Sequence, residues 1–303
     1  MGANAAMNIY LIAPDIESKF HKSEDGFNIP YPLMFSTSGL QMLAALTPER
    51  HTVKVVDETI GEKVDYDTSA DLIGITAMTT QSPRAYRIAQ KFRERGKPVV
   101  MGGFHPSIRP QEALLHCDAV CVGEGELVWG RMLEDFENGA LKKIYQAGRL
   151  IDFADIPWAD RSVVRDKKGA LKNFIQTTRG CPFQCSFCTV IKFFGHTYRL
   201  RPPEDVVAEV RALKESGQLK WNFVFFSDDN ICGDPEYAKR LFRALIPLKI
   251  RWGSQCSITA AGDEELLSLA RRSGCRAFAI GLESISDASL AAANKNMGKA
   301  GDY

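Results

Sequence analysis

The chain has 303 residues, of which 45% are hydrophobic and 25% are charged, and its formal net charge is +1. This length predicts about two domains, and the composition is that of an ordinary globular protein. A net charge so close to zero gives no basis for a nucleic-acid or anionic-membrane partner. We expect no transmembrane segment, because the sequence has no run of about 18 apolar residues.

Eight cysteines are too few for a disulfide scaffold in a chain of this length, and three of them lie close together. This pattern indicates a reducing compartment and metal chemistry. The first six residues also lack the charged and apolar regions of a signal peptide. A cytoplasmic location is therefore expected.

Short apolar stretches alternate with helical stretches in the first part of the chain, and a Pro-rich loop is expected at 29–32. The expected strands are 7–13, 51–56, 72–76, 98–101 and 119–122, and the expected helices are 37–46, 83–95, 111–115 and 126–137. Such alternation predicts a parallel sheet covered by helices on both faces. Residues 1–140 are therefore predicted to form an α/β domain with a Rossmann-like, doubly wound parallel sheet.

Small and polar residues follow several of these strands. They include Asp57, Thr76, Met78, Gly102, Gly103, Gly123, Glu124 and Gly125. In an open doubly wound sheet these positions meet at the carboxyl edge, where such folds bind ligands. Glycines there let a large ligand approach the backbone closely, although each single glycine is also explained by a tight turn. Together they favour a ligand site.

Residues 141–170 lack clean periodicity and carry several turn signals, so they are predicted to be a linker. The alternation then resumes in residues 171–303. Strands are expected at 173–178, 221–226, 250–257 and 276–281, and helices at 202–215, 235–245, 263–272 and 286–295. This order predicts a second parallel α/β region, of the kind found in βα barrels.

The loop after the first of these strands contains Cys181, Cys185 and Cys188 in a C-x3-C-x2-C spacing. Thiolates are the soft ligands that iron and zinc prefer, and close spacing lets one loop wrap a single centre. Three thiolates would hold three irons of a 4Fe–4S cube and leave the fourth iron open. The alternative is a structural zinc site with His196 as a fourth ligand, but such sites usually contain two separated cysteine pairs.

Polar residues also follow the other strands of this half. They are Asp228 and Asp229 after the second strand, Ser257 at the third and Glu283 after the fourth. Enzymes with βα barrels place their active sites at this end. A solvated turn at Asp228 and Asp229, and a core position for Phe187, are the structural alternatives. Arg199 and Arg201 are either anion contacts or a solvated pair.

The cysteine spacing resembles the signature of the radical S-adenosylmethionine enzymes. The resemblance implies that the open iron binds the amino and carboxylate groups of S-adenosylmethionine. It assigns the cofactor contacts to Phe187 near the adenine, Asp228 and Asp229 near the methionyl amino group, Ser257, and Glu283 near the nucleoside. Ser257 stands where the family often has an arginine.

The first half is similar to the cobalamin-binding domain that precedes many of these enzymes. The matching stretches are 56–61, 72–76, 100–106 and 122–126. The resemblance implies cobalamin contacts at Asp57, Gly61, Thr76, Met78, Gly102, Gly103, Gly123, Glu124 and Gly125. Thr59 stands where related cobalamin proteins carry a cobalt-binding histidine, so cobalamin is expected without a histidine ligand. His105 is interpreted as a structural loop residue.

The resemblance to cobalamin-dependent radical S-adenosylmethionine enzymes implies a methyltransferase that acts on an unactivated carbon or phosphorus centre. It would work through a 5′-deoxyadenosyl radical and methylcobalamin. The alternatives are a cyclase or rearrangement enzyme with the same cofactors, and an inactive cobalamin- or cluster-binding fragment. A small-molecule or lipid-like substrate and an electron donor such as flavodoxin or ferredoxin are implied.

Only four βα units follow the predicted linker, whereas the partial (β/α) barrel of this family has six. The resemblance therefore implies a partial (β/α) barrel of radical SAM type that lacks its last units. A sheet that ended at the fourth strand would leave an edge of unpaired backbone groups. The sequence is therefore expected to be truncated at its C-terminus, as a fragment or as a form completed by another chain.

Overall fold

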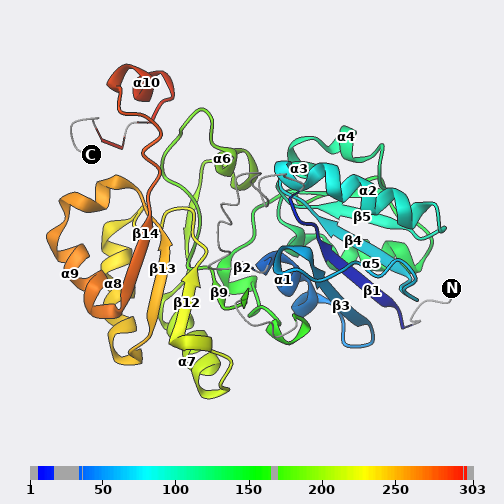
Figure 1. Cartoon of the computed structure of the whole chain (residues 1–303), viewed down its shortest axis with the longest axis horizontal. Helices are drawn as coiled ribbons and strands as arrows, with labels where there is room; N and C mark the ends of the chain where they lie inside the picture. Colours follow the sequence, from blue (N-terminus) through cyan, green and yellow to red (C-terminus); the bar gives the residue numbers. More distant parts are fainter. Residues whose placement is uncertain (1–5, 17–33, 36, 165–169, 296, 299–303) are drawn as a thin grey trace, which may run out of the picture. The chain divides into compact units, whose positions relative to one another are not determined.

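The computed structural model describes residues 6–16, 34–35, 37–164, 170–295 and 297–298 (Figure 1). The chain divides into two compact units. The first contains residues 1–151 and 155–172, and the second contains residues 152–154 and 173–303. Most of the predicted linker is thus counted with the first unit. The Pro-rich loop expected at 29–32 lies outside the described residues.

The first unit is built on a six-stranded parallel sheet with the strand order β3-β1-β4-β5-β6-β7. The strands are β1 (Asn8–Ala13), β3 (Thr52–Asp57), β4 (Leu72–Thr76), β5 (Val99–Gly102), β6 (Ala119–Val122) and β7 (Ile144–Gln146). The five strands expected from the sequence are present, while β7 falls in the predicted linker. The chain passes from β1 to β3 on one side and then to β4 on the other. This reversal is the switch point at which doubly wound sheets bind ligands.

Alternating residues of β1 pack into two separate cores, which explains why the strand is apolar throughout. Ile9 and Leu11 join a core with α1 (Ser38–Leu46) and α5 (Trp129–Glu137), whereas Tyr10 and Ile12 join a core with α2 (Ser82–Arg93). Short helices α3 (Phe104–Ile108) and α4 (Pro110–Ala113) follow β5. Both faces of the sheet are therefore covered, as the sequence predicts.

A small parallel pair, β2 (Met34–Phe35) with β8 (Ala170–Leu171), also belongs to the first unit.

Helices α2 and α1 begin where the sequence indicates. Pro83 lies in the first turn of α2, and Gly96 follows its end with a φ of 70°. Proline near the start and glycine just past the end are the usual boundaries of a helix.

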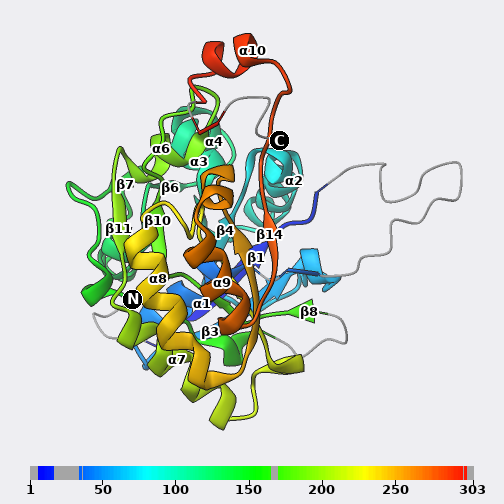
Figure 2. The ribbon, with the colours of Figure 1, turned by 90° about the vertical axis from the view of Figure 1, so that its left-hand side faces the viewer.

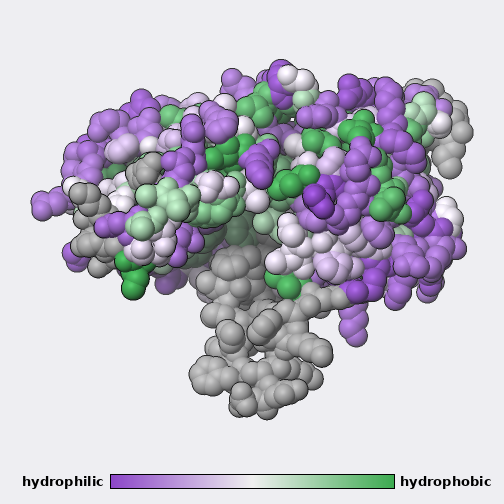
Figure 3. Space-filling view, turned by 90° about the horizontal axis from the view of Figure 1, so that it is seen from above, coloured by the Kyte–Doolittle hydropathy of each residue, from purple (hydrophilic) through white to green (hydrophobic). Residues whose placement is uncertain are grey.

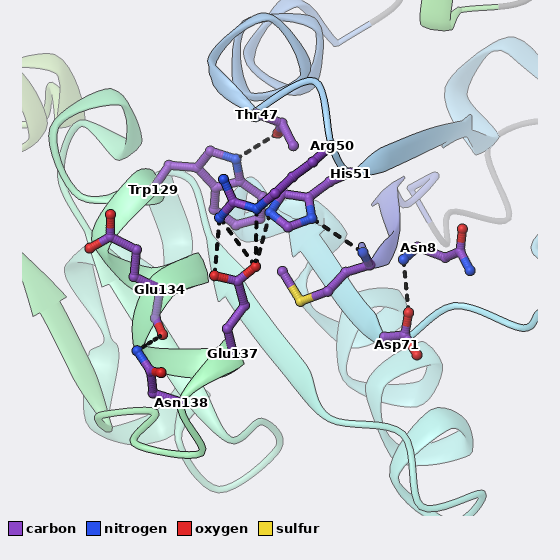
Figure 4. Close-up of polar contacts among 10 residues, drawn as sticks. Asn8, Thr47, Arg50, His51, Asp71, Trp129, Glu134, Glu137 and Asn138 are labelled. Carbon is purple, nitrogen blue, oxygen red and sulfur yellow. Dashed lines mark hydrogen bonds and ion pairs between the residues drawn. The ribbon is translucent and has the colours of Figure 1, made fainter. Parts of the chain in front are cut away.

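Figure 4 shows that ion pairs and hydrogen bonds close the amino-terminal side of this sheet. Glu137 accepts three hydrogen bonds from Arg50 and lies 3.3 Å from His51 Nε2. The backbone N–H of Met7 donates to His51 Nδ1, and Trp129 Nε1 donates to Thr47. Burial and the nearby Arg50 lower the pKa of His51. An open hollow of about 420 Å³ lies beside this network, but none of the predicted site residues lines it.

The second unit contains a four-stranded parallel sheet with the order β14-β13-β12-β9. The strands are β9 (Phe174–Ile175), β12 (Phe223–Phe226), β13 (Arg251–Gln255) and β14 (Cys275–Ala279). Helices α7 (Pro203–Glu215), α8 (Pro235–Leu245) and α9 (Glu264–Ser273) lie side by side along one face (Figures 1 and 2). Trp252, fully buried, packs against Phe226 and Phe242 beneath these helices.

The structure changes the predicted strand 173–178. β9 ends at Ile175, and the chain then leaves the sheet and forms β10 (Thr178–Gly180), which pairs antiparallel with β11 (Tyr198–Leu200). Helix α6 (Thr189–Phe194) lies between these two strands in sequence. The prediction of one continuous strand was wrong because the backbone N–H groups of Thr177 and Thr178 donate to Asp228 and not to a neighbouring strand.

The last described helix, α10 (Asp287–Ala292), stands beyond the end of β14 (Figure 1). The face of the molecule in Figure 3 is mostly hydrophilic, with separate hydrophobic patches. Among the residues that the structure describes, no helix has both the length and the apolar character needed to span a membrane.

Candidate functional site

The cysteine loop lies between β10 and α6 in the second unit. Gly180 begins it with a φ of 84°, and a Cβ atom there would lie 2.1 Å from the carbonyl oxygen of Thr197. Only glycine fits this close approach of the two hairpin strands. Cys185 is 7% exposed, and Cys181 and Cys188 are partly buried. Burial raises the pKa of both Cys181 and Cys185, so these thiols need a metal or a positive charge to ionise.

The three cysteines do not form a preformed site for a single metal ion among the residues that the structure describes. Within the described ranges, no group of three or more His, Cys, Asp or Glu residues could hold one metal ion. A tetrahedral zinc site requires its ligands to meet at one point, so the zinc alternative with His196 has no preformed site. A 4Fe–4S cube distributes its thiolates over different irons, and its ligands do not have to meet at one point. The C-x3-C-x2-C spacing on one loop, and not this absence, is what favours the predicted cluster.

Asp228 holds the chain in position just before this loop. It is fully buried, and its carboxylate accepts bonds from Thr177 N, Thr177 Oγ1 and Thr178 N, all at 2.7 Å. Burial raises the pKa of Asp228 to about 6 although three donors point at it. With its oxygens engaged in this way, Asp228 is placed as a structural residue and not as an open contact for a cofactor. The solvated-turn alternative is also wrong for this residue.

Asp229, the next residue, differs sharply. Its Oδ2 atom is buried and has no hydrogen-bond partner among the described residues. Burial, followed by the negative charge of Asp228, raises the pKa of Asp229 to about 7, while the Gly180 backbone opposes the shift. A buried carboxylate oxygen without a donor is costly and rare in native proteins. An ammonium group beside the cysteine loop would supply the missing donor.

Asn230 connects the cysteine loop to the end of β13, a role that sequence reasoning missed. Its Nδ2 lies 4.0 Å from the Cys181 sulfur, and its Oδ1 accepts a bond from Ser257 N at 3.0 Å. Its carbonyl oxygen accepts a bond from Tyr198 on β11. The Ser257 hydroxyl lies 2.6 Å from that of Thr259, so this side chain bonds within its own turn. The only sequence signal for Asn230 was its place directly after the two aspartates.

Glu283 and Phe187 are more open than the aspartates. The Glu283 side chain is 45% exposed, and its backbone is left-handed with a φ of 64°. Phe187 is 52% exposed, so the core alternative for this ring is wrong. Arg201 is buried in an ion pair with Glu209, which excludes the solvated pair suggested by the sequence. Glu283 and Phe187 therefore remain available for a cofactor.

In the first unit, the glycine directly after β5, Gly103, allows the close approach of the neighbouring loop. Gly103 has a φ of 92°, and a Cβ atom there would lie 2.6 Å from Thr76 Oγ1 and 3.0 Å from Ala77 N. Ala77 N donates to the carbonyl oxygen of Gly102. Ser107, which the sequence did not indicate, donates to the carbonyl oxygen of Gly103 and accepts from Gly123 N. These bonds join the loops after β4, β5 and β6 into one edge.

Other predicted residues of this edge have structural partners. Asp57 is buried and accepts bonds from Thr59 N, the Thr59 hydroxyl and Thr37 N. Gly61, with a φ of 75°, ends the short turn that follows. The hydroxyl at position 59 thus bonds back to the chain, and this turn offers no histidine.

The loop after β6 combines a tied carboxylate with a packed glycine. Glu124 is 5% exposed and accepts a bond from the backbone N–H of Ile151 at 2.9 Å. A Cβ atom at Gly125 would lie 3.3 Å from Leu43 on α1, so this glycine allows the loop to pack on the helix. Glu124 and Gly125 therefore hold the loop in place by contacts within the protein, and among the described residues the structure shows no open ligand contact for the Glu124 side chain or the Gly125 Cβ position.

Met78 and Gly123 leave space at the same edge. The Met78 side chain is 49% exposed, and a Cβ atom at Gly123 would have no neighbour within 4 Å. An exposed apolar side chain and an open glycine backbone at the switch-point edge fit a large flat ligand. His105 instead contacts Tyr86 and Glu112 and is 6% exposed, as expected of a structural residue.

Two family models match the two units. The model of the B12 binding domain matches residues 29–130, and that of the radical SAM superfamily matches residues 175–303. The chain thus joins a B12-binding domain to a domain of the radical SAM superfamily. The resemblance inferred from the cysteine spacing is thereby confirmed.

Curated and solved relatives agree with this family. Over 273 residues the chain is 35% identical to the bacteriochlorophyllide d C-8(2)-methyltransferase of Chlorobaculum tepidum, covering 84% of this chain and 59% of that protein. The fold matches the cobalamin-dependent S-adenosylmethionine radical enzyme OxsB with a TM-score of 0.72, 16% identity, and coverage of 98% of this chain and 46% of that one. It also matches the radical S-adenosylmethionine methyltransferase TsrM from Kitasatospora setae, with a TM-score of 0.72, 18% identity, and coverage of 97% and 62%. The B12-binding radical SAM chain thus spans about six-tenths of the bacteriochlorophyllide methyltransferase that it matches.

Proposed function

We propose that this chain carries the cobalamin and cluster sites of a radical S-adenosylmethionine methyltransferase that acts on an unactivated carbon or phosphorus centre. The observation that carries the proposal is the cysteine loop beside the unpartnered Oδ2 of Asp229, within the residues that match the radical SAM superfamily. The methyltransferase of Chlorobaculum tepidum supports the methylation outcome. A small-molecule or lipid-like substrate, an electron donor such as flavodoxin or ferredoxin, and a cytoplasmic location complete the proposal.

Cys181, Cys185 and Cys188 would hold the 4Fe–4S cluster. When bound, the cluster supplies the electron that cleaves S-adenosylmethionine and starts the radical chemistry. The residues around it bind and orient that cosubstrate. The Asp229 carboxylate accepts a bond from the methionyl ammonium, because its Oδ2 has no other donor among the described residues. Glu283 and the exposed ring of Phe187 are open to its nucleoside part.

Cobalamin would lie at the carboxyl edge of the first sheet, against Thr76, Met78, Gly102, Gly103 and Gly123. When bound, it carries the methyl group that is transferred. Asp57, Gly61, Glu124 and Gly125 shape this edge through their own contacts, as described above. Since Thr59 replaces the histidine of other cobalamin proteins, the cobalt would have no histidine ligand from this turn.

Metal analysis of the wild type and of a variant with Cys181→Ala, Cys185→Ala and Cys188→Ala tests the two sites separately. After anaerobic reconstitution with iron, sulfide and cobalamin, the wild type should contain both iron and cobalt. The triple variant should lose iron and keep cobalt, because its cobalamin residues lie in the other unit. Zinc in place of iron, or loss of cobalt together with iron, would contradict the proposal.

Product analysis tests the reaction. Under a strong reductant, the reconstituted wild type should form 5′-deoxyadenosine and the triple cysteine variant should form none. A product in which a methyl group has replaced a hydrogen atom, a net gain of one CH2 unit, supports methylation. An unchanged product mass points to a rearrangement with the same cofactors, and cobalamin binding without 5′-deoxyadenosine identifies an inactive binding fragment.

A further inference from the structure

A lysine is buried beside the cysteine loop without a role in the site described so far. The side chain of Lys295 is 6% exposed, although lysine is among the residues least often buried. Its Nζ lies 3.6 Å from Glu283 Oε1 and 5.9 Å from the centre of the Phe187 ring. Both contacts are residues predicted to bind S-adenosylmethionine. This ammonium group therefore faces the candidate cofactor site.

The turn that carries Lys295 is fastened to the cysteine loop on both sides of Cys185. The N–H and the hydroxyl of Ser186 both donate to the carbonyl oxygen of Ala293, at 2.9 and 3.2 Å. Asn294 Nδ2 donates to the carbonyl oxygen of Gln184 at 2.7 Å. The turn itself is closed by a bond from Lys295 N to the last turn of α10. The cysteine loop and the lysine are thus held in one local framework.

The same lysine restrains Glu283. A Cβ atom on Gly281 would lie 2.3 Å from Glu283 Oε1 and 3.7 Å from Lys295 Nζ, so the carboxylate folds back over the glycine toward the ammonium group. Glu283 has a left-handed backbone, which is unfavourable for a residue with a side chain. An ion pair with a buried partner helps to hold this conformation.

We propose that Lys295 is a positioning residue that holds Glu283 in place and puts a positive charge beside Cys185, which makes the proposed cluster easier to reduce. The inference rests on the proposed function, since it requires the cluster to be present. Charges and hydrogen bonds around an iron–sulfur cluster tune its reduction potential. A positive charge stabilises the reduced, more negative form, and burial protects that effect from screening by water and salt.

The test compares Lys295→Met, Lys295→Arg and Lys192→Met in the reconstituted protein. Lys192 is an exposed lysine on α6, four residues after Cys188, so its replacement makes the same charge change in water. The midpoint potential of the cluster is measured by redox titration with electron paramagnetic resonance. Lys295→Met should shift it to more negative values, while Lys295→Arg and Lys192→Met should leave it near that of the wild type.

The affinity for S-adenosylmethionine gives a second readout. The affinity should fall by about twofold to fivefold in Lys295→Met and recover in Lys295→Arg. This is the loss expected for an ion pair in which one partner, here Glu283, is half-exposed. Unchanged potential and affinity in a Lys295→Met protein with full iron content would overturn the inference. If Lys295→Met does not retain iron, Lys295→Arg decides: a cluster at the wild-type potential supports the role of the charge, and loss of iron overturns it. Absence of iron in the wild type itself would instead contradict the proposed function.

Discussion

The two sheets of this protein end in different kinds of surface. The carboxyl edge of the first unit is made mainly of backbone, with glycines at 102, 103 and 123 and few open side chains. The carboxyl edge of the second unit is made of thiols and carboxylates. Its two adjacent aspartates differ: Asp228 accepts hydrogen bonds from the chain, whereas Asp229 has a buried oxygen without a partner among the described residues. The first edge suits a large ligand recognised by shape, and the second suits a small charged ligand recognised by pairing.

The largest effect should come from Asp228→Ala, which tests whether this aspartate is structural. Removal of the carboxylate leaves the two backbone N–H groups and the hydroxyl of Thr177 and Thr178 without their acceptor. A loss of about 3 kcal/mol in the free energy of unfolding is expected, because buried unsatisfied donors are costly. Urea denaturation followed by tryptophan fluorescence measures it. A change no larger than that of Asp229→Ala would show that Asp228 does not hold the strand end.

Asp229→Asn should have opposite effects on stability and binding. The affinity of the reconstituted protein for S-adenosylmethionine should fall by roughly tenfold to a hundredfold, the loss expected for one charge-assisted hydrogen bond. Equilibrium binding with isolated S-adenosylmethionine measures it. Undiminished affinity would remove Asp229 from the site.

In the cofactor-free protein, the effect of Asp229→Asn on the melting temperature should depend on pH. Burial raises the pKa of Asp229 to about 7 in the folded protein, above its ordinary value of 3.8. The ionisation of Asp229 therefore lowers the free energy of unfolding progressively as the pH rises from about 4 to about 7, and the loss stays constant above that. Asn carries no charge, so Asp229→Asn should stabilise the fold more at about pH 8 than at about pH 5. Equal melting-temperature shifts at both pH values would argue against the buried charge.

The smallest effect is expected from alanine substitutions at two glycines of the first unit. The pair tests whether a glycine contacts the ligand or only needs its left-handed backbone. Gly123 and Gly139 are both left-handed, with φ values of 80° and 67°, and a Cβ atom at either has no neighbour within 4 Å. Alanine at each should cost about 1–2 kcal/mol from the left-handed conformation alone. Only Gly123→Ala should also reduce the cobalt retained per chain after gel filtration. Equal cobalt in the two variants would place the ligand away from Gly123.

Local patterns were enough to predict most of the fold. The alternation of apolar strands and helices gave both parallel sheets, and proline or glycine marked helix ends such as those of α2. The break after β9 could not be predicted, because its cause is Asp228, about 50 residues later in the chain. The three-residue strands β10 and β11 are likewise too short to show a period.

The candidate site was predictable in its residue types and not in their partners. The spacing of the cysteines indicated the loop directly. Nothing in the sequence distinguished Asp228 from Asp229. Burial and the positions of the donors in the fold decide which of the two carboxylates is hydrogen-bonded to the chain. The links from Asn230 to Cys181 and Ser257, and from Lys295 to Glu283, join residues that only the fold brings together.

The cysteine loop is held almost entirely by residues that are synthesised after it. Asp228 and Asn230 follow the residues that they hold by about 50 positions, and Ala293 follows Ser186 by 107. At about 5–20 residues per second, a ribosome needs roughly 5–20 s to make the whole interval from Ser186 to Ala293. During biosynthesis the three cysteines are therefore made before the residues that hold their loop. The turn at Ala293 is the last of these supports to be made.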